Sequence, residues 1–140
     1  MGYHADVFTG VKALIEAAVS VPVLSHLDKI EAYTERYPAF IVVVRVGIEY
    51  EASPVIGQAG PQYETWTWDF YVCGGGGASR DAGKATHVDT LLETIRTGIT
   101  QTKPESVNCG RLNIVSETYD SHHGASVIYK QTWTHDRMDG

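Results

Sequence analysis

Cysteines and long hydrophobic runs are both scarce in this sequence of 140 residues. Its two cysteines, Cys73 and Cys109, lie far apart and neither belongs to a Cys-x-x-Cys pair. This spacing predicts no disulfide framework and favours a reducing compartment, so we place the chain in the cytoplasm of its producing cell. The longest apolar run, 39–44, is far shorter than the about 18 residues of a membrane-spanning helix, so no membrane partner is expected. No secretion signal is recognisable at its start.

Basic residues are also few. The chain has 11 Lys and Arg against 17 Asp and Glu, which gives a formal net charge of −6. Binding to a phosphate backbone needs a positively charged surface, so specific or tight nucleic-acid binding is not expected. An acidic surface would repel DNA that passes close to it without holding it, so passage of DNA stays compatible with this composition.

Phosphate-binding and dinucleotide-binding motifs are absent. The glycine run 74–77 precedes a predicted helix, and helix N-termini bind anions. A phosphate-binding loop needs glycine five residues before Gly83, where Ala78 stands, and Ser79 replaces the third glycine of the dinucleotide motif. We therefore interpret this run as a flexible strand-to-helix link and expect no cofactor.

Catalytic and metal-binding patterns are missing as well. The six histidines include no His-x-x-x-His or Glu-x-x-His pair, and no Gly-x-Ser-x-Gly motif occurs. His122 and His123 are adjacent, so in a strand they would point to opposite faces. We predict no catalytic residue, no metal site and no enzymatic activity.

Two amphipathic helices and four strands account for most of the chain. The first helix starts at Asp6 or Thr9 and ends before Pro22, and the second covers about 81–100. Strands are predicted over 39–50, 63–73, 111–118 and 125–135, and 23–38 is predicted to be an irregular connection with room for one short strand or helical turn. The tetrad 74–77 breaks the sheet, and 119–124 forms a hairpin turn.

Alternating hydrophobic residues define the strand faces. The strand 39–50 carries one stripe at period two, made of Phe40, Val42, Val44, Val46, Ile48 and Tyr50. The strand 63–73 carries Trp66, Trp68, Phe70 and Val72 on one face, which can bury either a helix or a neighbouring subunit.

These elements predict one α+β domain over 1–140. Consecutive strands without intervening helices favour a mostly antiparallel sheet of about four or more strands, with two main helices packed on it. We also predict a flexible loop at 51–62 and a loose C-terminal tail at 136–140.

The order of these elements resembles the tail terminator, or tail completion, proteins of tailed bacteriophages. The resemblance covers nearly the whole chain as architecture. It rests on the first helix, the strand around 38–43, the aromatic strand 65–72, the helix around 88–95, and a hairpin that ends in 127–133.

The resemblance implies a structural virion protein and no catalytic residues. Its members form closed rings, commonly hexamers, that cap the tail tube and face the head-side connector. It implies a homo-oligomeric ring, a tail tube protein and a neck protein as partners, and a place at the junction of tail and neck after assembly in the host cytoplasm. Exposed loops on a rigid sheet carry recognition, so we expect contacts at 51–62 and 119–124. The predicted interface residues are Glu51, Gln58, Gln62, Asp120, His122 and His123.

Two other interpretations stay open. A different head–tail connector component, such as a neck or stopper protein, would have the same size and composition. A small ligand-binding or enzyme domain would need a pocket with converging titratable groups near Gly74, Ser79 and His87.

Overall fold

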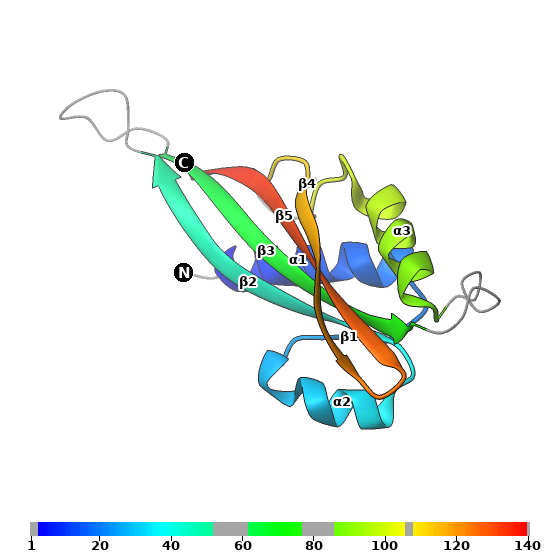
Figure 1. The fold of residues 1–140 in the computed structure, drawn as a ribbon. Helices are drawn as coiled ribbons and strands as arrows, with labels where there is room; N and C mark the ends of the chain where they lie inside the picture. Colours follow the sequence, from blue (N-terminus) through cyan, green and yellow to red (C-terminus); the bar gives the residue numbers. More distant parts are fainter. Residues whose placement is uncertain (1–2, 52–61, 77–85, 106–107, 140) are drawn as a thin grey trace.

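The structure, a computed structural model, describes residues 3–51, 62–76, 86–105 and 108–139. Among these residues it has the predicted α+β architecture, with three α-helices and a five-stranded mixed sheet (Figure 1). The elements are α1 (Tyr3–Ala18), β1 (Val23–Leu24), the 3₁₀ helix η1 (Leu27–Lys29), α2 (Ile30–Arg36), β2 (Phe40–Glu51), β3 (Gln62–Gly75), α3 (Val88–Ile99), β4 (Asn113–His123) and β5 (Ser126–Asp139).

The sheet has the strand order β1-β2-β3-β5-β4. All neighbouring strands are antiparallel except β1 and β2, so the prediction of a mostly antiparallel sheet is confirmed. The segment 23–38, predicted to be mainly irregular, contains β1, η1 and α2. The predicted second helix is confirmed over 88–99, and residues 81–85 of that prediction lie outside the described residues.

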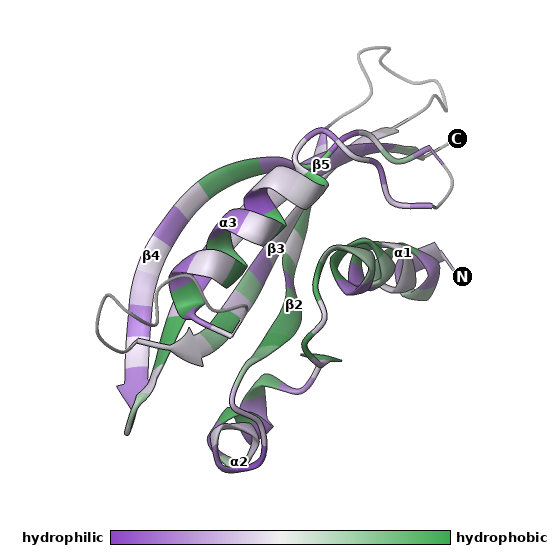
Figure 2. Ribbon diagram, turned by 90° about the vertical axis from the view of Figure 1, so that its right-hand side faces the viewer, coloured by the Kyte–Doolittle hydropathy of each residue, from purple (hydrophilic) through white to green (hydrophobic). Residues whose placement is uncertain are grey.

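The main core lies between one face of the sheet and the helices α1 and α3. Figure 2 shows hydrophobic residues on these two helices and on the strands that they cover. The stripe Trp66, Trp68, Phe70 and Val72 is fully buried in this core within a single chain. The stripe therefore packs against helices, and the alternative that it forms a contact between subunits is wrong. A smaller cluster on the other face joins Phe40 and Val42 to α2.

The predicted single stripe along β2 is wrong beyond Val44. The pairing of β2 with β3 shifts register between Arg45 and Gly47, so one extra residue interrupts the alternation of faces. As a result Ile48 packs against the main core, while Val46 is 55% exposed.

Two predicted loop boundaries are also wrong. The tail predicted to be loose is strand as far as Asp139, because β3 pairs with it on one side and Asn108 and Gly110 bond to it on the other. The Gly110 amide donates to the Asp136 carbonyl at 2.7 Å. The hairpin turn is shorter than 119–124, because β4 continues through His123 and Gly124 adopts φ +61°.

The sheet has two open edges among the described residues. Strand β1 covers only Ile41 and Val42 of β2, so the outer edge of β2 is unpaired from Val43 to Glu51. On the opposite side β4 pairs with β5 alone. The open part of β2 lies toward the far end of the sheet, where β2 ends at Glu51, and β4 lies toward the turn end, where Gly124 joins β4 to β5.

Candidate assembly surfaces

The predicted interface residues fall into two groups at opposite ends of the sheet. Glu51 ends β2 and Gln62 begins β3 at the far end, whereas Asp120, His122 and His123 belong to β4 at the turn end. Gln58 lies outside the described residues. A strand of 14 residues such as β3, at about 3.3 Å per residue, spans about 45 Å. The two groups therefore cannot contact the same small site on a partner.

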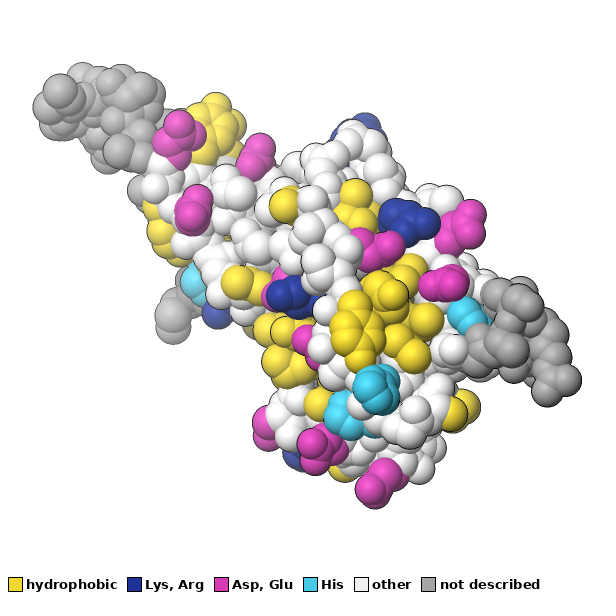
Figure 3. All heavy atoms as spheres, in the orientation of Figure 1, with side chains coloured by type: hydrophobic (Ala, Val, Ile, Leu, Met, Phe, Trp, Pro, Cys, Tyr) yellow, Lys and Arg dark blue, Asp and Glu magenta, His cyan; other side chains and the backbone are white. Residues whose placement is uncertain are grey.

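The surface at the turn end combines an exposed tyrosine with imidazole and carboxylate groups. Tyr119 is 53% exposed, and its ring meets the edge of Tyr129 with 5.8 Å between centroids. The Tyr119 hydroxyl lies 2.7 Å from Nδ1 of His122. The Ser121 hydroxyl donates to the Asp120 carboxylate at 2.9 Å. Figure 3 shows hydrophobic side chains beside histidines over this end of the hairpin, so the surface here is both polar and aromatic.

The surface at the far end is more hydrophobic than the sequence predicted. Tyr50, Tyr63 and Met138 are 52%, 48% and 38% exposed. Tyr63 pairs with Glu51 on one side and with Met138 on the other, so these three residues cross the sheet in one row. The interface residues predicted from the sequence do not include these exposed hydrophobic side chains or Tyr119, because alternation alone does not tell which tyrosines in a strand remain uncovered.

A buried ion pair holds α1 to the far half of the sheet. Glu64 is fully buried, and its carboxylate accepts hydrogen bonds from Trp66 Nε1 at 2.9 Å, from the Tyr3 hydroxyl at 3.1 Å and from Arg137 Nη1 at 3.3 Å. The Arg137 guanidinium also lies 3.8 Å from the centre of the Tyr3 ring. Burial, and then the adjacent Glu64 carboxylate, raise the pKa of Tyr3 to about 12, so its hydroxyl stays a donor.

These groups satisfy one another, which indicates a structural role. Both oxygens of Glu64 accept hydrogen bonds from the protein, and none of the residues of this cluster lines either of the grooves described along α1. Because these contacts join Tyr3 of α1, Glu64 of β3 and Arg137 of β5, the ion pair is a brace between the three elements.

His135 of β5 is buried against the tryptophans of β3. It is 2% exposed and stacks with Trp66 and Trp68 at 5.9 Å and 6.2 Å between ring centroids. Its Nδ1 lies 3.1 Å from the Asp136 carbonyl oxygen, and its Nε2 has no hydrogen-bond partner among the described residues. Burial lowers the pKa of His135 from its ordinary value of 6.5, because a charged imidazole would lose its hydration.

We expect His135 to make the fold less stable in acid. As pH falls below 6.5, the unfolded chain takes up a proton at this position before the folded chain does, so unfolding becomes more favourable. The variant His135→Phe keeps an aromatic ring in the stack and cannot titrate. Between about pH 7 and about pH 5, the variant should lose less unfolding free energy than the wild type in urea titrations. Equal losses of unfolding free energy in the variant and in the wild type would contradict this prediction.

The described residues beside the glycine run, Gly74, Gly75 and His87, line neither of the two described grooves. Gly74 and Gly75 complete β3, and His87 is 6% exposed and caps α3, where its Nδ1 accepts from the Asp89 amide at 3.1 Å. Ser79 lies outside the described residues. In the described part of the chain, no group of three or more His, Cys, Asp and Glu residues could hold a metal ion.

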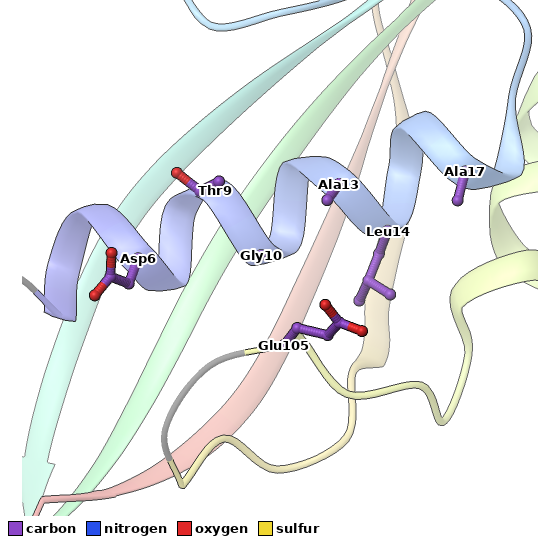
Figure 4. A pocket seen from close by; sticks show the side chains of 7 residues that line it. All are labelled: Asp6, Thr9, Gly10, Ala13, Leu14, Ala17 and Glu105. Atoms are coloured by element: carbon purple, nitrogen blue, oxygen red, sulfur yellow. The ribbon is translucent and has the colours of Figure 1, made fainter.

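The larger of the two described grooves lies along the outer side of α1. It has a volume of about 560 Å³ and is lined by Asp6, Thr9, Gly10, Ala13, Leu14, Ala17 and Glu105 (Figure 4). Two carboxylates and a threonine among small apolar groups provide neither a cationic group nor a base paired with a nucleophile. Its polar groups are the carboxylates of Asp6 and Glu105 and the hydroxyl of Thr9.

No protein-family model matches the chain, and no curated protein is significantly similar to it. None of the described helices is long and apolar enough to cross a membrane.

Proposed function

We propose that this chain is a tail terminator subunit, a structural virion protein of a tailed bacteriophage. About six copies form a closed ring at the junction of tail and neck, which ends the tail tube on one side and meets the head-side connector on the other. The observation that carries this proposal is the separation of two exposed contact surfaces to opposite ends of one sheet, with an open edge on each flank.

Each part of this geometry corresponds to one contact that a ring subunit needs. The far end, with Tyr63 and Met138, and the hairpin turn after His123 suit two axial partners. The unpaired edge of β2 and the outer edge of β4 suit two lateral neighbours. An enzyme would need converging groups in a cleft, whereas this chain distributes its exposed apolar groups around a sheet.

The sequence charge is also compatible with DNA passing through the ring. With a net charge of −6, the chain has no excess of cations with which to hold phosphates. DNA that crosses the ring would then move without being held by its wall.

The purified chain tests the proposal through its mass and its shape. We expect a species of about six times the 15.3 kDa chain mass by native mass spectrometry, and annular particles by electron microscopy. Labelled protein in purified virions should lie between tail and head, and a label only on the head side of that junction would favour a neck or stopper protein instead. A monomer that binds a small molecule saturably, or a dimer that does not grow, would contradict the proposal.

A further inference from the structure

The two open edges carry most of the exposed hydrophobic groups. Among the described residues, six large hydrophobic side chains are exposed: Val46, Tyr50, Tyr63, Val115, Tyr119 and Met138. Two of them lie on the unpaired part of β2 and two on β4, with exposed fractions between 52% and 62%. An unpaired strand with exposed hydrophobic residues can pair with a strand of another chain. Natural sheets protect such edges unless the edge serves as a binding surface.

The directions of the two edge strands are opposite. Strand β2 runs from the turn end to the far end, whereas β4 runs in the opposite direction and ends at the turn end. Copies related by rotation about one axis keep the same direction along that axis. The β4 strand of one copy therefore meets β2 of the next copy as an antiparallel pair.

The spacing of the exposed residues also agrees between the edges. Val46 and Tyr50 are four residues apart, as are Val115 and Tyr119. In an antiparallel pair, one register therefore places Val115 opposite Tyr50 and Tyr119 opposite Val46. The same register places Asp120 opposite Arg45, which are both exposed and of opposite charge.

We propose that neighbouring copies of this chain join by antiparallel pairing of β4 with the open part of β2, in this register. The partner is a second copy of the chain. This inference rests on the proposed function in one respect: the pairing itself needs only two copies, whereas the closure of the paired copies into a ring belongs to the proposed function. Main-chain hydrogen bonds hold the two strands together. The register is selected by the two hydrophobic pairs and by the Asp120–Arg45 pair.

Pairing of β4 with itself is less favourable. An antiparallel β4–β4 pair that placed Val115 opposite Tyr119 would place Glu117 opposite Glu117 of the other copy. Like charges directly opposite one another are destabilising, and Val46 and Tyr50 would stay exposed. Register shifts at Arg45/Gly47, Ile114/Ser116 and Tyr119/Ser121 add kinks to both edges, which oppose pairing with an arbitrary flat strand.

Cysteine cross-linking tests the register in the purified full chain. The natural Cys73 and Cys109 are buried, so new surface cysteines react first. The variant Tyr50→Cys/Val115→Cys should form disulfide-linked multimers upon mild oxidation, because opposite residues have Cβ atoms within about 5 Å. The control Glu49→Cys/Val115→Cys is one residue out of register and should give about tenfold less cross-linked product.

A charge exchange provides a second measurement. Arg45→Asp should weaken self-association by about tenfold, and Arg45→Asp/Asp120→Arg should recover most of it. Circular dichroism of each variant confirms that the fold is retained.

The outcomes separate this contact from the proposed function. Rings without cross-links would overturn the edge pairing and leave the ring function standing. Cross-linked chains that grow without closing would support the pairing and contradict the ring. Dimers from Glu117→Cys alone would mean that β4 pairs with β4 and would overturn the inference, because Glu117 lies opposite itself in that register. A chain that neither cross-links nor associates at any concentration would also overturn the inference.

Discussion

Replacement of Arg137 by methionine is expected to lower the free energy of unfolding by about 3–5 kcal/mol. Arg137 is 5% exposed, and its partner Glu64 is fully buried. The variant would leave a carboxylate inside the core without its cation, and removal of one partner of a buried pair costs far more than the pair contributes. Urea or guanidinium titrations measure this loss as a fall in the midpoint at unchanged slope.

Two controls show whether the loss comes from an unpaired charge. The double variant Glu64→Met/Arg137→Met should be markedly more stable than Arg137→Met, because it removes both charges. Lys12→Met removes an exposed pair, in which Lys12 Nζ lies 3.3 Å from the Glu16 carboxylate, and should cost under about 0.5 kcal/mol. If Arg137→Met costs no more than Lys12→Met, the ion pair is not the brace described above.

Replacement of Gly74 by alanine is expected to cost about 1–3 kcal/mol. A Cβ atom at this position would lie 2.6 Å from the Thr86 carbonyl oxygen and 2.8 Å from the Val88 amide nitrogen, and both are backbone atoms. The adjacent Gly75 amide donates to the same Thr86 carbonyl at 2.9 Å. Alanine would therefore separate the end of β3 from the start of α3.

Gly47→Ala is the matched control for this prediction. A Cβ atom there would meet no atom of the described residues within 4 Å, and alanine in place of glycine within a strand should raise stability by about 0.5–1 kcal/mol. Thermal or urea unfolding of the two variants gives the comparison. Equal stability of Gly74→Ala and Gly47→Ala would mean that β3 and α3 are not in close backbone contact.

The sequence predicts those parts of the fold whose hydrophobic period continues over many residues. The strand with Trp66 and Trp68 and the helix around Leu91 and Ile95 each repeat their pattern several times, and both are where we expected them. Strand β1 has two residues, which is too short for a period to be detected. The register shift after Arg45 inverts the face of β2 and has no marker in the sequence that we recognised.

The candidate surfaces could be predicted only in part. Loops and turns indicate where contacts are expected, but only the strand pairing shows that Glu51 and His122 lie at opposite ends of the sheet. Glu64 has the same alternation as Trp66 and Trp68, which is a signal that it faces the core. Its partner Arg137 is 73 residues away, and that pairing depends on strand neighbours that sequence spacing does not give.

The position of the open edges at opposite ends of the sheet determines how the strands would lie in a ring. Within one copy, Gly47 is level with Asn113, whereas the proposed contact brings Val46 beside Tyr119 of the neighbour. Each copy is then offset by about five strand steps, or about 17 Å, over a width of four strands, or about 19 Å. The copies can close into a circle if their strands are inclined by about 40° to the ring axis, because this inclination compensates the offset. Strands in closed β-barrels are tilted by similar angles. Six such copies would give a wall of about 150 Å circumference and about 50 Å diameter, and upright strands would instead give an open spiral.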